Sequence, residues 1–339
     1  MIEGHGDDIY RYDDLVKTNF SSNVYQHADL TALKEHLASC FYLIANYPEP
    51  QPRSLEKLIA QKEGISPDSV MVTNGATEAI YMIARLFHGS ASIIPQPTFN
   101  EYADACRINK HIISFESNDD AMQMPRDRVY WICNPNNPSG NVLMKGFMDY
   151  VVRRSPRYTF VVDQSYENYT LEPLLKAREL QGITNIFLLH SLSKTYGVPG
   201  LRLGYVTSDP ANILLLRNLC HPWSVSALSI EAGCFLLKHG TPVVTDIKTY
   251  LEETERLRTM LRETEGIRVF ETKTNYMLCE LEHFTATELK NRLVHDYGML
   301  IRDCSNFFGL TNHFFRVSTQ KPEENDALVA AIREILKSQ

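Results

Sequence analysis

The sequence has no long apolar run and no excess of positive charge. No stretch approaches the length needed to span a bilayer, and the N-terminal residues MIEGHGDDIYRYDD are acidic and lack the apolar core of a secretory signal. The formal net charge is −7 at pH 7, whereas a protein that binds nucleic-acid phosphates needs a basic face. We therefore expect a cytoplasmic protein that binds neither a membrane nor nucleic acid.

Closely spaced cysteine pairs are also missing. The seven cysteines are scattered, odd in number and never spaced as C-x-x-C. This pattern is typical of free thiols in a reducing compartment, and it favours neither a zinc site nor a disulfide framework. A bound metal ion is therefore not expected.

What the sequence does contain is an alternation of helix and strand patterns. With 339 residues, 44% of them hydrophobic and 22% charged, the chain can form a large domain and a smaller one. From residue 54, amphipathic segments alternate with short apolar runs, which are typical of strands covered on both faces. We expect an α/β fold with a large domain over 46–235, a smaller C-terminal α+β domain over 236–339, and an N-terminal arm over 1–45 that joins the small domain and the substrate site.

Several of the apolar runs end directly in a polar cluster. The clusters are, in chain order, NGATE, PTFNEY, NPNNPSG, DQSY and SLSKTYGVPGLRLGY. Ligands of open α/β sheets bind at strand ends, so these clusters are joint candidates for one site. Taken alone, each has an ordinary alternative: a lysine after a strand is usually solvated, Asp163 could cap a helix, and Gly75 could supply only a tight turn. Their occurrence together and in this order favours a single binding site.

The five clusters resemble those of the fold-type I enzymes that use pyridoxal 5′-phosphate (PLP), the superfamily of the class I and II aminotransferases. The resemblance extends over nearly the whole chain and is most specific around Lys194. It implies a large domain with a mostly parallel, seven-stranded sheet, and covalent binding of the cofactor aldehyde by Lys194. A lysine amine suits that role once burial and neighbouring cations lower its pKa.

The same resemblance implies cofactor contacts for the other clusters. Asp163 would pair with the pyridine nitrogen and keep the ring electron-withdrawing, Tyr166 and Asn137 would hydrogen-bond the ring hydroxyl, and Phe99 would stack on the ring. The cofactor phosphate would lie where NGATE opens a helix, since helix N-termini bind anions. The residues implied around the phosphate are Gly75, Ala76, Thr77, Ser191, Ser193 and Arg202. Tyr47, in NYPEP, would reach the phosphate of the other subunit, so a homodimer with shared active sites is expected.

Two C-terminal arginines are the candidate substrate anchors. Arg316, in FFRVSTQ, matches the carboxylate-binding arginine of the superfamily. Arg302, in LIRDCSNFFGL, stands where enzymes with phosphorylated substrates carry a second cation. Planar guanidinium groups suit both carboxylate and phosphate. The alternative is that both are surface arginines on strands.

Four stretches resemble the threonine-phosphate decarboxylases of cobalamin biosynthesis, which are relatives of the histidinol-phosphate aminotransferases. The stretches are EGHGDD, FSSNV, HPWSVSALSIEAG and LIRDCSNFFGL. This resemblance implies a phosphorylated amino acid as substrate and its decarboxylation, from L-threonine O-3-phosphate to (R)-1-amino-2-propanol O-2-phosphate and CO2. It also makes His5 and Asn23 candidate substrate contacts.

The sequence departs from that family's pattern in two places. Asp7 and Asp8 follow His5 where the family usually has Gly and Asn, and two carboxylates beside a phosphate would repel it unless they point away. Ser226 replaces the usual asparagine of the PWSVNALA stretch, which leaves a shorter hydrogen-bonding side chain.

Two other functions fit parts of the pattern. An aminotransferase of the histidinol-phosphate type would share Lys194, Asp163, Arg202 and Arg316, so these residues do not separate it from a decarboxylase. A PLP-fold regulator or binding module would usually carry a separate DNA-binding domain, for which the tract before residue 20 is short. The full set of cofactor residues also argues against such a module.

Overall fold

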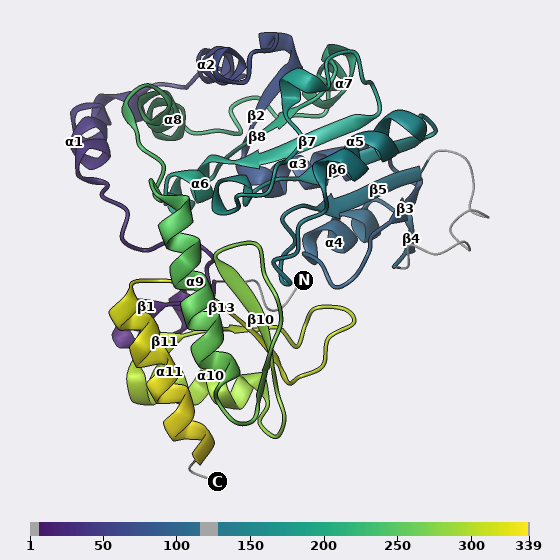
Figure 1. Ribbon diagram of the computed structural model, residues 1–339. Helices are drawn as coiled ribbons and strands as arrows, with labels where there is room; N and C mark the ends of the chain where they lie inside the picture. Colours follow the sequence, from purple (N-terminus) through teal and green to yellow (C-terminus); the bar gives the residue numbers. More distant parts are fainter. Residues whose placement is uncertain (1–6, 116–127, 338–339) are drawn as a thin grey trace.

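The computed structural model describes residues 7–115 and 128–337, and its largest element is a seven-stranded sheet (Figure 1). The strand order is β2-β8-β7-β6-β5-β3-β4. Neighbours from β7 to β4 are parallel, whereas β8 runs antiparallel to both of its neighbours. The strands are β2 (Val70–Asn74), β3 (Ala91–Ile93), β4 (Ile112–Ser114), β5 (Arg128–Cys133), β6 (Tyr158–Asp163), β7 (Ile186–Ser191) and β8 (Leu203–Thr207). The mostly parallel sheet confirms the expected fold class.

Helices cover both faces of this sheet, because successive residues of a strand point to opposite sides. Val161 of β6 packs in a core that includes residues of α3 and α4, whereas Phe160 and Val162 pack in a core that includes residues of α5. The helices of this part are α2 (Arg53–Glu63), α3 (Gly75–Leu86), α4 (Glu101–Ile108), α5 (Lys145–Arg154), α6 (Leu192–Thr195), α7 (Pro210–Arg217) and α8 (Ala227–His239). Burial on both faces explains why the strands are continuously apolar in the sequence.

A smaller α+β layer follows α8 in the sequence and forms the lower part of Figure 1. Its four-stranded antiparallel sheet has the order β12-β13-β10-β9. The strands are β9 (Ile267–Val269), β10 (Tyr276–Leu281), β12 (Arg302–Asp303) and β13 (Phe314–Ser318), and the helices are α9 (Ile247–Arg262), α10 (Ala286–Tyr297) and α11 (Pro322–Lys337). The highly charged segment Ile247–Arg262 forms α9. The domain boundaries at residues 45/46 and 235/236 stay predictions.

The N-terminal segment lies against this smaller layer before it enters the larger part. Strand β1 (Thr18–Asn19) pairs in parallel with β11 (Met299–Leu300), and α1 (Thr31–Ser39) then packs against α8. Short 3₁₀ turns occur at Ile9–Arg11, Asp13–Leu15, Phe41–Ala45, Pro67–Ser69, Glu167–Tyr169, Ala177–Glu179 and Pro199–Leu201. The pairing of β1 with β11 brings the segment that contains FSSNV close to Leu300 and Ser318.

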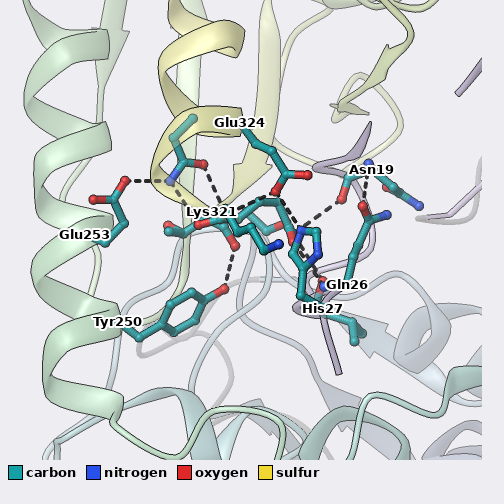
Figure 2. A network of polar contacts seen from close by, with 12 residues as sticks. Asn19, Gln26, His27, Tyr250, Glu253, Lys321 and Glu324 are labelled. Atoms are coloured by element: carbon teal, nitrogen blue, oxygen red, sulfur yellow. Dashed lines mark hydrogen bonds and ion pairs between the residues drawn. The ribbon is translucent and has the colours of Figure 1, made fainter. Parts of the chain in front are cut away.

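A polar network holds the N-terminal segment against α9 and the start of α11 (Figure 2). Gln320 is 1% exposed; its side chain accepts a hydrogen bond from the Gln26 amide at 3.1 Å and donates to the Val24 carbonyl at 3.2 Å. Asn325 links this group to α9, because it donates to Glu253 at 2.7 Å and accepts from the Gln320 amide at 3.0 Å. The backbone of residues 19–26 is therefore fixed by side chains from the far end of the chain.

No helix in the part of the chain that the structure describes is long and apolar enough to cross a membrane. All seven cysteines fall within that part and carry free thiols, and five of them are buried.

Candidate functional site

The carboxyl ends of β5, β6 and β7 lie around a cavity of about 560 Å³. All five polar clusters singled out in the sequence contribute to its wall, together with both candidate substrate arginines. The predicted residues that line it are Gly75, Ala76, Thr77, Phe99, Asn137, Asp163, Tyr166, Ser191, Ser193, Lys194, Arg202, Arg302 and Arg316. The expectation that these clusters meet at one site is thus matched by the geometry.

Lys194 lies on the single turn of α6 that follows β7. Its Nζ donates to the Ser22 carbonyl at 3.0 Å and lies 5.6 Å from the centre of the Tyr166 ring. Burial lowers the pKa of Lys194 to about 8, and the positive charges of Arg316 and Arg202 act in the same direction, whereas Asp7 opposes them. A large fraction of the amine is therefore neutral near pH 8, and the neutral amine is the nucleophilic form.

Asp163 is the last residue of β6 and is only 4% exposed. Its two carboxylate oxygens accept separate hydrogen bonds, Oδ1 from the Ser165 amide at 2.9 Å and Oδ2 from the Tyr102 hydroxyl at 2.8 Å. Both donors are neutral, and no ion pair to Asp163 is found among the described residues. A buried carboxylate with this surrounding fits a ligand that brings its own positive charge, such as a protonated pyridine ring.

The part of the cavity wall formed by Gly75 and Arg202 suits a phosphate group. Gly75 has φ +78° and opens α3, and a Cβ added there would lie 2.4 Å from Nη2 of Arg202. At Gly204 a Cβ would lie 2.5 Å from the Ala76 nitrogen. The two glycines thus let the guanidinium group and strand β8 approach the helix N-terminus, where backbone N–H groups favour an anion.

The two predicted phosphate serines differ in their contacts. Ser191 ends β7 and lines the cavity. Ser193 also lines it, but its hydroxyl already bridges the backbone of Leu203, accepting from the amide at 3.2 Å and donating to the carbonyl at 3.3 Å. Ser193 therefore holds the turn that carries Lys194 in addition to facing the cavity.

The residues expected around the cofactor ring include one, Asn137, that contacts the candidate substrate anchor Arg316. Burial raises the pKa of Tyr166 to about 12, which keeps its hydroxyl protonated. Asn137 accepts a hydrogen bond from Nη1 of Arg316, and Phe99 packs edge-on against Tyr102 with 5.7 Å between ring centres. A candidate substrate anchor thus contacts a residue that is expected to bind the cofactor.

Arg302 and Arg316 face each other in the register of β12 and β13 and are 6% and 3% exposed. Arg316 donates to the Ser21 carbonyl at 2.5 Å, and its Nε is buried without a hydrogen-bond partner among the described residues. Arg302 donates to Oδ1 of Asn306 at 2.7 Å. The alternative of two surface arginines is therefore wrong, and two buried cations in one cavity fit an anionic ligand.

The two N-terminal carboxylates that depart from the family pattern point in different directions. Asp8 is buried against Lys290, whose Nζ lies 2.6 Å from Oδ2. Asp7 lines the cavity and accepts from the Asn19 amide side chain at 2.9 Å. Asp7 thus stays in the cavity in which the phosphorylated substrate is expected to bind. His5 lies outside the described residues.

Two other predicted site residues do not line the cavity of their own chain. Asn23 is fully buried, has φ +56°, and its side chain donates to the Tyr166 hydroxyl at 3.4 Å. Tyr47 is 84% exposed and packs its ring against Trp223 with 5.1 Å between centres. Its expected reach to another subunit stays a prediction. Ser226, at the position that departs from the family pattern, caps the N-terminus of α8 by accepting from the Ser229 amide.

Several lining residues were missed in the sequence, among them Ser21, Ser22, Tyr102 and Asn306. Tyr102 and the two serines lie inside PTFNEY and FSSNV, which were noted for other residues. The signal for the serines was weak because they act through backbone carbonyls, which any residue type supplies.

The aminotransferase class I and II family matches residues 16–332 of the sequence. The chain belongs to this family. Its members depend on PLP, and the buried carboxylate, the lysine of lowered pKa and the glycine-opened anion site described above fit that cofactor. The chain is therefore a PLP-dependent enzyme of class I and II.

Individual relatives include both decarboxylases and aminotransferases. The crystal structure of L-threonine-O-3-phosphate decarboxylase from Porphyromonas gingivalis is 36% identical, covers 95% of this chain and 100% of its own, and superimposes with a TM-score of 0.89. Threonine-phosphate decarboxylase of Salmonella typhimurium is 28% identical over 94% of this chain and 91% of its own length. Histidinol-phosphate aminotransferase of Caldanaerobacter subterraneus subsp. tengcongensis is 29% identical over 86% and 84%.

Proposed function

We propose that this enzyme decarboxylates L-threonine O-3-phosphate to (R)-1-amino-2-propanol O-2-phosphate and CO2. The observation that carries the proposal is the pair of buried arginines, Arg302 and Arg316, in the cavity that also holds Lys194. A substrate with one phosphate and one carboxylate offers one anion to each guanidinium group. The likeness to the P. gingivalis decarboxylase over its full length supports the same substrate class.

In this proposal the sheet end of the cavity holds the cofactor. Lys194 would bind its aldehyde and Asp163 would pair with its ring nitrogen. Tyr166 and Asn137 would bind the ring hydroxyl, and Phe99 would stack on the ring. Gly75, Ala76, Thr77, Ser191, Ser193 and Arg202 would surround its phosphate. When bound, PLP withdraws electrons from the α-carbon of an amino acid and so eases loss of a substituent there.

The other end of the cavity would hold and orient the substrate. Arg316 would bind the carboxylate and Arg302 the phosphate, with Asn306 holding the Arg302 fork at 2.7 Å. Burial lowers the pKa of Arg302, and the nearby charge of Arg316 contributes to that shift. An anion between the two groups would relieve this repulsion. Asp7, which lines the cavity, would disfavour ligands with excess negative charge and so would narrow the range of accepted anions.

A second candidate function is transamination of the histidinol-phosphate type. It is favoured by the similarity to the histidinol-phosphate aminotransferase of C. subterraneus subsp. tengcongensis. The two functions would use the same cofactor residues and differ in the bond that is broken at the α-carbon. They are best separated by their need for an oxo acid.

The test is incubation of the PLP-loaded enzyme with L-threonine O-3-phosphate and no oxo acid. We expect CO2 and the amino alcohol phosphate in equal amounts, and no CO2 from the Lys194→Ala variant. Absence of CO2, together with oxo-acid-dependent transfer of the amino group from histidinol phosphate, would overturn the decarboxylase proposal in favour of the aminotransferase.

The proposal includes a homodimer with shared sites, a cytoplasmic location and a place in cobalamin biosynthesis. A surface that carries Phe41, Tyr42, Ile44, Tyr47 and Trp223, with exposed fractions from 47% to 84%, supports the dimer, since large exposed apolar groups are typical of interfaces. Light scattering should give twice the monomer mass of 38.8 kDa. Restored activity on mixing Lys194→Ala and Tyr47→Ala subunits would support a site shared between them.

A further inference from the structure

Tyr102 is a buried residue that lines the cavity and hydrogen-bonds Asp163. It lies on α4, is 1% exposed, and its hydroxyl donates to Oδ2 of Asp163 at 2.8 Å. The other carboxylate oxygen is bound by the Ser165 amide. Each oxygen of Asp163 thus has one fixed donor, and the plane of the carboxylate is set from two sides.

The Tyr102 ring is itself held in place. It stacks on Trp131 with 5.8 Å between ring centres and 24° between planes. Trp131 donates to the Ser92 hydroxyl at 3.0 Å, and Ser92 lies 2.8 Å from Nδ1 of His111. Burial, followed by the charge of Asp163, raises the pKa of Tyr102 well above its ordinary value. The hydroxyl is therefore a permanent donor in a fixed position.

We propose that Tyr102 is a positioning residue that keeps the carboxylate of Asp163 aimed at the pyridine nitrogen of the cofactor. This inference rests on the proposed role of Asp163. The physical reason is that a buried carboxylate needs hydrogen-bond donors, because an unpaired buried charge is costly. Without the Tyr102 hydroxyl, Oδ2 of Asp163 would lose its donor and the carboxylate would turn away, which would weaken its attraction to a protonated ring.

The test is the variant Tyr102→Phe, which removes one oxygen and keeps the ring on Trp131. We expect its dissociation constant for PLP to rise about 10-fold, since a hydrogen bond to a charged group is lost. We also expect the absorption spectrum of the bound cofactor to differ from that of the wild type, with the ring nitrogen losing its proton at lower pH. Neither measurement needs a substrate, so both hold whichever reaction the enzyme catalyses.

A matched control is Tyr81→Phe. Tyr81 also lines the cavity, but its hydroxyl donates to Glu101 at 2.8 Å and not to Asp163. This variant should keep the PLP affinity and the spectrum of the wild type. Equal changes in the two variants would overturn the inference, because they would show a general effect of removing a cavity hydroxyl.

The variant Asp163→Asn separates this inference from the role on which it rests. If Asp163→Asn leaves PLP affinity unchanged, the role of Asp163 is wrong and the inference falls with it. If Asp163→Asn weakens PLP binding and Tyr102→Phe does not, only the inference about Tyr102 is overturned. If Tyr102 acts through Asp163, adding Tyr102→Phe to Asp163→Asn should weaken PLP binding less than about twofold further.

Discussion

The two ends of the cavity are built in different ways. At the proposed cofactor end, Asp163 ends β6 and Lys194 follows the adjacent parallel strand β7, so the sheet itself brings them together. At the proposed substrate end, Arg302 and Arg316 come from a second sheet, and the backbone carbonyl that binds Arg316 comes from Ser21. The cofactor end therefore depends on local strand order, and the substrate end depends on packing between distant segments.

The two ends are also coupled electrostatically. Arg316 donates to Asn137 of the cofactor end, and after burial its charge is the largest contribution to the lowered pKa of Lys194. A change in Arg316 should therefore affect both ends, whereas a change in Arg302 should affect the substrate end alone.

The largest effect is expected at the cofactor end from Lys194→Ala. Removal of the amine should lower kcat by about 10³-fold or more, because the covalent step is lost. The fold should persist, since within the described part of the chain the Nζ donates a hydrogen bond to the Ser22 carbonyl alone. Steady-state kinetics and circular dichroism measure the two quantities. Residual activity near the wild-type level would contradict the assignment.

At the substrate end, Arg302→Gln should raise KM for L-threonine O-3-phosphate by about 30-fold or more, since a buried charge-assisted contact to phosphate is lost. PLP affinity should be unchanged. Arg268→Gln, at an arginine that is 71% exposed in its side chain, is the control and should have no effect. A loss of PLP affinity in Arg302→Gln would show that the two ends are not separable in this way.

The pH dependence of cofactor attachment tests the coupling between the ends. Because only the neutral amine reacts, the rate at which the apoenzyme binds PLP covalently should rise with pH and level off above about 8, the pKa of Lys194. Replacing Arg316 by Met removes a cation that disfavours the protonated amine, so the pKa should rise and the plateau should move to higher pH. Stopped-flow absorbance measures both profiles, and an unchanged plateau in Arg316→Met would contradict the coupling.

The smallest effect is expected from Gln320→Ala, which acts on the N-terminal segment. Loss of the hydrogen bonds to residues 24 and 26 should lower the free energy of unfolding by about 1–3 kcal/mol and raise KM a few-fold without changing PLP affinity. His27→Gln is the control: its pair with Glu324, at 2.7 Å, is partly exposed in the same network, so about 0–1 kcal/mol is expected. Equal effects of the two variants in urea unfolding would contradict the role given to Gln320.

The sequence predicted the cofactor end more fully than the substrate end, and the reason is physical. Lys194, Asp163 and Gly75 each stand within a few residues of the end of an apolar run, and the carboxyl ends of parallel strands share one edge of a sheet. Arg302 and Arg316 were found through resemblance alone. The contacts of Ser21 and Ser22 depend on β1 pairing with β11, and no local pattern encodes a pairing between residues 281 positions apart.

The departures from the family pattern were informative only in part. Asp7 and Asp8 were expected to repel a phosphate unless they pointed away. Asp8 pairs with Lys290, whereas Asp7 lines the cavity. The ion pair with Lys290 holds Asp8 in place, and Lys290 lies on α10, far from the N-terminus in the sequence. The hydrogen bond between Tyr102 and Asp163 was missed for the same reason, since it joins two elements 61 positions apart.

The most direct test of this account is borohydride reduction of the PLP-loaded enzyme followed by peptide mass mapping. Reduction makes the bond between a lysine and the cofactor permanent, so the modified residue can be identified. We expect a single cofactor-sized mass increase on the peptide that contains Lys194, and none in Lys194→Ala. An unmodified Lys194, or a cofactor attached to another lysine, would contradict it.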